Sequence, residues 1–304
     1  MISLNVFNET NPLKAVLLGT AESNGVVPSP EACYDPSSRQ HVLSGTYPIE
    51  SNMISEMTAL ESIFKSYDIT VYRPNIISDY NQIFSRDIAF VIEDQLIKSN
   101  ILPDREAELL AITDILEQIN LSKIIELPEE CHIEGGDVIL HDDYIFVGVY
   151  TGDDYPNYIT ARTNIQAVRA LQSLFPHKII KSFELKKSNT NPLENALHLD
   201  CCFQPLGHGK ALIHKGGFLN PDDVKFLEQF FGSNNIFYAT KSEMAAMYCN
   251  VFSISQDVII SEQSFTRLND WLRYQKFHVE EVPYIEISKQ GGLLRCSTMP
   301  LIRA

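Results

Sequence analysis

Residues 291–303 read Gly-Gly-Leu-Leu-Arg-Cys-Ser-Thr-Met-Pro-Leu-Ile-Arg, which places Cys296 between a glycine pair and an apolar tail. Three other short segments mix reactive residues with turn-forming ones in the same manner. They are Ser85-Arg86-Asp87, His132-Ile133-Glu134-Gly135-Gly136-Asp137 and His198-Leu199-Asp200-Cys201-Cys202-Phe203. We take the four segments together, because each one alone has an ordinary structural explanation.

Around these segments, apolar runs typical of strands alternate with amphipathic stretches typical of helices. The runs are 15–18, 69–72, 88–92, 137–140, 144–149, 251–253 and 258–260. The helical stretches begin near residues 51, 105, 163, 222 and 264, so successive starts lie 54, 58, 59 and 42 residues apart. This spacing predicts a repeated strand-and-helix unit and an α/β architecture of about five modules. No linker-like tract marks a boundary, so we expect residues 1–304 to form a single catalytic domain.

The composition excludes several classes of protein. A net charge of -15, from 39 acidic and 24 basic side chains, argues against binding to nucleic acid or an anionic membrane surface. No apolar stretch reaches the length of a membrane helix, and the N-terminus lacks the pattern of a signal peptide. Six cysteines in 304 residues do not make a disulfide framework, so a cytoplasmic location is expected.

The ordinary explanations of the four segments are specific. Arg86 and Asp87 could form a surface ion pair, and Gly135-Gly136 could be a turn with solvated acidic neighbours. His198 and Asp200 would share one face of a strand as a satisfied polar pair. Cys296 could be a small buried hydrophobe.

One chemistry uses all four segments. A guanidinium group is planar and permanently cationic, and carboxylates can hold its N–H groups. Attack on its central carbon suits a thiolate, which a neighbouring cation stabilises. Expulsion of ammonia or an amine needs a proton donor such as histidine, held and supported by a carboxylate. Candidates for these tasks are Asp87, Glu134, His198, Asp200 and Cys296.

At these residues the chain resembles the guanidino-group-modifying enzymes: arginine deiminases, dimethylarginine dimethylaminohydrolases and amidinotransferases. Residues 291–303, 132–138 and 198–203 are similar to the nucleophile, Glu-Gly-Gly-Asp and His-x-Asp segments of arginine deiminases. Residues 8–16, and Arg73-Pro74 before Arg86-Asp87, are closer to glycine amidinotransferase. The resemblance extends over nearly the whole chain. It implies a five-bladed α/β propeller, the pentein fold, which agrees with the five modules.

The resemblance also implies roles. Cys296 would attack the guanidinium carbon, His198 would protonate the leaving nitrogen and then activate the second nucleophile, and Glu134 would lie beside both histidine and guanidinium. Asp87 and Asp200 would clamp the guanidinium. Arg162, and as an alternative Arg105, would bind a substrate carboxylate. For both arginines a surface salt bridge remains the alternative.

Two departures from the deiminase pattern bear on the substrate. The extra helical insertion that arginine deiminases carry is missing between Asp87 and Glu134. Ser288-Lys289-Gln290 stands where an arginine usually precedes the nucleophile, and only Lys289 could replace it. Both differences speak against free arginine as the substrate.

No cofactor or metal is expected. The chain has neither a Gly-rich phosphate loop nor a Walker-type lysine. The adjacent Cys201 and Cys202 lack the spacing of a zinc site, so we expect them to pack in the core.

The sequence therefore predicts an enzyme that takes a small guanidino substrate. The first hypothesis is a hydrolase that acts on arginine or an arginine derivative through a covalent Cys-amidino intermediate. The second is an amidinotransferase with an amine acceptor such as glycine, although Glu134 stands where amidinotransferases often have Asp. The third is a non-catalytic guanidino-binding protein, against which stands the full set of reactive residues. The oligomeric state is left open.

Overall fold

The computed structural model describes all residues 1–304, and its strands form five separate three-stranded sheets. In every sheet the middle strand pairs antiparallel with one neighbour and parallel with the other. The middle strands are β1 (Leu13–Leu18), β4 (Gln95–Lys98), β7 (Tyr144–Val149), β10 (Ala211–Ile213) and β13 (Val258–Glu262). Their antiparallel neighbours are, in the same order, β15 (Thr298–Arg303), β3 (Ala89–Ile92), β6 (Val138–His141), β9 (Phe203–Pro205) and β12 (Phe252–Ser253). Their parallel neighbours are β2 (Thr70–Tyr72), β5 (Ile124–Glu126), β8 (Ile179–Glu184), β11 (Ile236–Tyr238) and β14 (His278–Val282). The predicted fivefold repetition of a strand-and-helix unit is confirmed.

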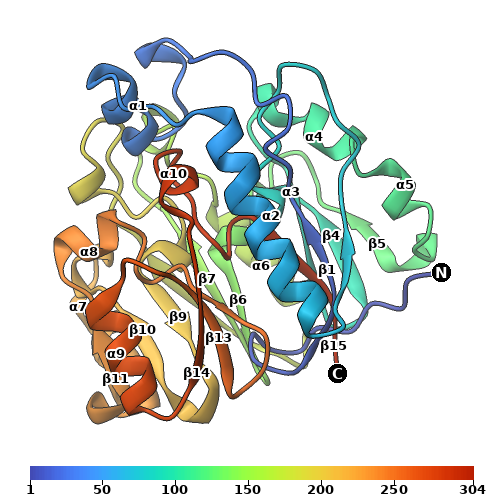
Figure 1. Ribbon diagram of the computed structural model, residues 1–304. Coiled ribbons are helices and arrows are strands. Elements are labelled where there is room, and N and C mark those ends of the chain that lie inside the picture. Colours follow the sequence, from blue (N-terminus) through green and yellow to red (C-terminus); the bar gives the residue numbers. More distant parts are fainter.

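Each pair of parallel strands is joined by a helical crossover, because parallel neighbours cannot be connected by a tight turn. The crossover helices are α2 (Glu50–Ser66), α4 (Ala107–Leu110) with α5 (Thr113–Leu116), α6 (Ile165–Leu174), α7 (Pro221–Phe231) and α9 (Thr266–Tyr274). Helices α4 and α5 lie on one side of the molecule, and α7 and α9 on the opposite side (Figure 1). No helix combines the length and apolar character that a bilayer crossing requires.

The other helices are short. They are α1 (Pro36–Leu43), α3 (Ser85–Ile88), α8 (Lys241–Ala245) and α10 (Ile285–Ser288). Single 3-10 turns occupy Pro30–Ala32, Pro103–Arg105, Leu121–Lys123, Gly135–Asp137, Tyr155–Asn157, Pro192–Glu194, Leu199–Cys201, Gly207–Gly209, Lys215–Gly217 and Ser233–Asn235.

The second predicted helix is the exception among the five, because it is not continuous. The chain leaves helical geometry at Ile112 (φ -105°, ψ 11°), between α4 and α5. The Thr113 hydroxyl donates a hydrogen bond to the Leu110 carbonyl at 2.8 Å, which competes with a backbone hydrogen bond there. At this break the Ile112 side chain lies in the core, where the residue is 1% exposed. Two single turns therefore replace one amphipathic helix.

The first and last modules close on each other. β15 at the C-terminus pairs with β1 at the N-terminus, and the two strands lie side by side near the chain ends (Figure 1). Phe64 of α2 packs edge-on against Phe252 of the fifth sheet, with ring centroids 5.6 Å apart. Leu60 of α2 and Leu268 of α9 belong to the same buried cluster. The fold thus brings residues near 296 next to residues near 86.

Candidate active site

The reactive segments occupy equivalent places in successive modules. Each lies directly before the antiparallel outer strand of its sheet. Asp87 ends up in α3 before β3, Glu134 before the turn that enters β6, and His198 before the turn that enters β9. Asn250 and Cys296 each stand two residues before their strands, β12 and β15. The repeated topology therefore gathers five chemically useful side chains at one place.

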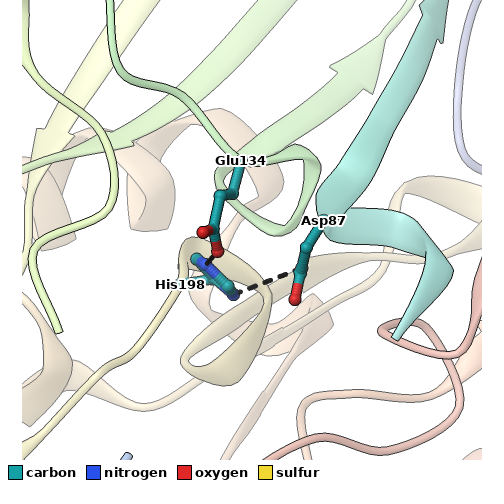
Figure 2. Close-up of side chains that lie close together, drawn as sticks. All are labelled: Asp87, Glu134 and His198. Carbon is teal, nitrogen blue, oxygen red and sulfur yellow. Dashed lines mark hydrogen bonds and ion pairs between the residues drawn. The ribbon is translucent and has the colours of Figure 1, made fainter. Parts of the chain in front are cut away.

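His198 lies between two carboxylates (Figure 2). Its Nε2 is 2.8 Å from Glu134 Oε2, and its Nδ1 is 3.7 Å from Asp87 Oδ1. Burial opposes protonation of the imidazole, but Asp87 and the hydrogen bond with Glu134 raise the pKa of His198 to about 9. Burial would also raise the pKa of Glu134, yet Arg162, His198 and Arg105 together hold it well below its usual value. His198 is therefore an imidazolium at neutral pH, ready to act as an acid.

Cys296 lines the same cavity as Asp87 and His198 and is 3% exposed. Its Sγ is 3.2 Å from Asn250 Nδ2, and 4.0 Å and 3.8 Å from the two carboxylate oxygens of Asp200. Burial, reinforced by the Asp200 carboxylate, raises the pKa of the Cys296 thiol well above its usual value. The thiolate therefore forms readily only when a cation enters beside it.

Alkylation of Cys296 should reveal this raised pKa. In the free protein we expect iodoacetamide to modify Cys296 at pH 7 more slowly than it modifies free glutathione, and the rate to keep rising above pH 9. The physical reason is that only the thiolate reacts, and Asp200 disfavours it. Modification is followed by peptide mass spectrometry. A rate that levels off below pH 8 would contradict this picture.

The two predicted carboxylate-binding arginines both lie in the site, and both are already bound to carboxylates. Arg162 Nη1 is 3.0 Å from each oxygen of Glu134, and its Nη2 donates to the Tyr34 carbonyl at 2.9 Å. Arg105 bridges Asp87 at 2.9 Å and Glu108 at 2.7 Å. Their side chains are 2% and 9% exposed, so the alternative of a surface salt bridge is wrong for both.

Asp200 is held next to Cys296. Arg295, which is fully buried, donates from Nη1 to Asp200 Oδ2 at 2.9 Å and from Nη2 to Glu9 Oε1 at 2.8 Å. Asp200 does not line the cavity, whereas Asp87 does, and Oδ1 of Asp87 is buried without a hydrogen-bond partner. The carboxylate that lines the cavity thus belongs to Asp87, whose Oδ1 is ion-paired with His198 Nδ1 at 3.7 Å, and the clamping role of Asp200 stays a prediction.

Three of the four ordinary explanations do not describe the surroundings of their segments. Asp87 and Glu134 are 4% and 1% exposed, so neither is part of a solvated surface pair or turn. His198 and Asp200 are not on a strand, because residues Leu199–Cys201 form a 3-10 turn before β9. A long-range contact holds this turn, because Asp137 Oδ1 accepts a hydrogen bond from the Leu199 amide at 2.9 Å.

Three residues of the site were not among the predicted catalytic or substrate-binding residues. Asp137 supports the turn behind His198, and Glu108 neutralises Arg105. Asn250 Oδ1 accepts hydrogen bonds from the amides of Arg295 and Cys296, at 2.9 Å and 3.2 Å, and so fixes the nucleophile segment. For Glu108 the only available signal was its position three residues after Arg105, which places both on one face of a helical turn.

Asp87, Glu134 and His198 are the one group of side chains whose ligand atoms lie close enough together to hold a metal ion, within 4.8 Å of one another. Their charges are already matched, because Arg105 and Arg162 contact the two carboxylates and His198 donates to one of them. A metal ion would have to displace a proton from His198 and compete with both guanidinium groups. The donor set therefore suits proton transfer better than metal binding.

Gly136 has no side chain and so leaves room for the His198 imidazole. Replacing Gly136 by alanine tests how much this position of His198 matters. A Cβ on Gly136 would lie 2.5 Å from His198 Nδ1, so Gly136→Ala must push the imidazole away. We expect turnover to fall on the order of 100-fold, as for a catalytic group misplaced by about 1 Å. Steady-state kinetics beside thermal unfolding measure the effect. Gly45→Ala is the control, because Gly45 has φ +68° but open space around it, so it should lose stability but no activity.

The five-module fold, and a cavity lined by a cysteine and by a histidine that lies between two carboxylates, define a guanidino-group-modifying enzyme of the pentein class. The chain belongs to the family described as N,N dimethylarginine dimethylhydrolase, eukaryotic, whose model matches residues 32–303.

Individual proteins are similar to the chain in sequence or in fold. The chain is 33% identical over 223 residues to the uncharacterized protein YkgA of Bacillus subtilis, covering 73% of this chain and 70% of YkgA. It is 28% identical over 269 residues to an arginine deiminase of Listeria welshimeri, covering 73% of this chain and 62% of the deiminase. Its fold matches SxtG, an amidinotransferase from Microseira wollei, with a TM-score of 0.80 at 18% identity, over 99% of this chain and 98% of SxtG.

Proposed function

We propose that this protein is a cysteine-dependent hydrolase that acts on the guanidinium group of arginine or an arginine derivative. The observation that carries the proposal is the arrangement around His198, an imidazolium held between Asp87 and Glu134 in the cavity that Cys296 also lines. The family model, described as a dimethylarginine hydrolase, supports hydrolysis over transfer.

The reaction begins when the substrate guanidinium enters the cavity. Asp87 Oδ1, which makes no hydrogen bond and faces His198 Nδ1 at 3.7 Å, accepts N–H groups of the guanidinium. The positive charge of the guanidinium offsets the Asp200 carboxylate that disfavours the thiolate. Cys296 loses its thiol proton to water, and the Sγ thiolate then attacks the guanidinium carbon and forms a C–S bond. His198 gives its proton to the leaving nitrogen, the C–N bond breaks, and ammonia or an amine departs.

The second half of the reaction returns the enzyme to its starting state. Neutral His198 takes a proton from water as the water oxygen attacks the same carbon. The C–S bond breaks, the hydroxyl proton of the intermediate passes to the sulfur, and a neutral ureido product leaves with the Cys296 thiol restored. Glu134 holds the imidazole through both halves, since its Oε2 lies 2.8 Å from Nε2.

An amidinotransferase is the second candidate, because an amine acceptor can take the place of water after the same intermediate. The similarity in fold to an amidinotransferase keeps this candidate open.

Residues 1–304 would form one catalytic domain, and a cytoplasmic location fits six unpaired cysteines.

One experiment separates these candidates. The purified protein is incubated with a panel of guanidino compounds, with and without glycine and other amines, and products are followed by mass spectrometry. A ureido product formed without any amine supports the hydrolase. A guanidinylated amine formed only with the acceptor would replace it by the transferase. No turnover, with Cys296 never modified, would favour a non-catalytic guanidino-binding protein.

A further inference from the structure

The sulfur of Cys296 contacts a hydrogen-bond donor as well as a carboxylate. Its Sγ lies 4.0 Å and 3.8 Å from the two carboxylate oxygens of Asp200. Burial and the Asp200 charge raise the pKa of the thiol, and a hydrogen bond with the Leu293 backbone opposes them. The one side-chain donor within hydrogen-bond distance of the sulfur is Asn250, whose Nδ2 is 3.2 Å from Sγ. The proposed reaction steps leave this contact without a role.

The side-chain amide of Asn250 can have only one orientation. Its Oδ1 accepts hydrogen bonds from the backbone amides of Arg295 and Cys296, at 2.9 Å and 3.2 Å. Its Nδ2 donates one N–H group to the Asp200 carbonyl at 3.4 Å and the other to Sγ. Exchanging the oxygen and the nitrogen would set N–H groups against two amide donors, and an oxygen against a carbonyl oxygen. An N–H group therefore points at the sulfur.

This donor is fixed in place before any substrate arrives. Asn250 is fully buried, and its backbone amide donates to the Met247 carbonyl at 2.9 Å. Its side chain accepts two hydrogen bonds and donates two, so a rotation of the amide would break several contacts at once. A donor that is already in position needs no reorganisation when charge develops on the atom it faces. A hydrogen bond to an ionised group is also stronger than one between neutral groups.

We propose that Asn250 is a catalytic residue that stabilises negative charge on Cys296 Sγ through its Nδ2–H group. This role rests on the proposed function, in which Cys296 is the nucleophile. The hydrogen bond first supports the thiolate that remains when the thiol proton passes to water. It acts again when the C–S bond breaks and the electron pair of that bond returns to sulfur. In both steps it offsets part of the repulsion from the Asp200 carboxylate.

Two substitutions separate donation to the sulfur from support of the backbone. Asn250→Asp keeps an acceptor for both backbone amides but places an oxygen where Nδ2 stood. Asn250→Leu has a similar size, carries no charge and can neither donate nor accept. Because only the thiolate reacts, the rate of alkylation of Cys296 by iodoacetamide is measured between about pH 7 and 10 by peptide mass spectrometry. The control is Asn220→Asp, since Asn220 is exposed and caps α7 by accepting from the Asp222 amide at 3.0 Å.

Both Asn250 variants are expected to be alkylated at Cys296 at least about 10-fold more slowly than the wild type at about pH 8, because a hydrogen bond to a charged group has an effect of that order. Turnover should fall by about 10- to 100-fold, with a smaller change in KM than in kcat. The reason for this difference is that Asn250 does not line the cavity. Asn220→Asp should change neither rate.

Thermal unfolding, followed by circular dichroism, establishes that each variant is folded, and Asn250→Ala replaces Asn250→Leu if the latter does not fold. A folded Asn250→Asp that is alkylated as fast as the wild type would overturn the inference. A rate that falls in Asn250→Asp but not in the uncharged variant would overturn it too, because the added charge would then be the cause. If no guanidino compound is turned over, the proposed function fails, and alkylation, which needs no substrate, still decides whether Asn250 stabilises the thiolate.

Discussion

Replacing Cys296 by alanine is expected to reduce turnover of any guanidino substrate by about 10⁴-fold or more. In the proposed mechanism the Cys296 thiol supplies the protein's only covalent bond to the substrate carbon, so neither His198 nor Asp87 can compensate for its loss. Substrate binding should persist, because the oxygens of Asp87 and Glu134 that face His198 are unchanged. Mass spectrometry of protein quenched during turnover should show a covalent adduct on the wild type and none on Cys296→Ala.

Cys33 provides the matched control, since it is the other cysteine that lines the cavity. It is partly exposed, and its Sγ donates to the Ser29 carbonyl at 3.4 Å. Cys33→Ala should retain turnover and the covalent adduct. If Cys33→Ala lost activity while Cys296→Ala retained it, the nucleophile would be Cys33 and the proposed mechanism would be wrong.

Arg295→Met should produce the largest loss of stability of any single change in the site. Arg295 is fully buried between Glu9 and Asp200, and it also donates to the Val138 carbonyl at 2.7 Å. Its removal leaves two buried carboxylates without their counter-ion, which costs about 3–5 kcal/mol of the free energy of unfolding. Urea unfolding, followed by tryptophan fluorescence and circular dichroism, measures this loss.

The pH dependence of stability gives a second test of the same contact. Burial would raise the pKa of Glu9, but Arg295 and Arg86 lower it from 4.5 to about 2. Because the folded-state pKa is depressed, Glu9 contributes stability above pH 4.5 and loses that contribution as the pH falls toward 2. Arg295→Met should reduce this part of the acid-induced loss, while Arg86 keeps the remainder.

An exposed ion pair serves as the control for Arg295→Met. Arg273 is 48% exposed and contacts Glu281 at 2.6 Å. Arg273→Met should change the free energy of unfolding by less than about 1 kcal/mol, because water screens an exposed pair. Equal effects of the two substitutions would mean that the Glu9–Arg295–Asp200 contacts do not stabilise the fold.

The sequence predicted the elements that have a strong local signal. All seven apolar runs contain a strand, and Met53, Met57, Leu60 and Phe64 are buried on one face of α2 as their spacing required. Other strands went unrecognised. β8, for example, is mostly half-exposed, and β9, β10 and β11 have three residues each, which is too short for a periodicity to be visible.

The sequence by itself determined the chemistry that this protein can perform. Cys296, His198, Glu134 and Asp87 are the residue types that guanidinium chemistry needs, and their segments are recognisable because turn residues and apolar runs surround them. The fivefold alternation of strands and helices was also local information, since hydrophobic periodicity depends only on neighbouring residues.

Only the tertiary structure decided which partner each charge has. Arg162 is far from Glu134 in sequence, and Arg295 is 286 residues from Glu9, yet both pairs are buried and in contact. The sequence left Arg162 and Arg105 available for a substrate carboxylate, whereas the fold has neutralised both. The physical reason is that a buried charge needs a counter-ion. Which counter-ion it meets depends on how the modules pack in space and not on the spacing of residues along the chain.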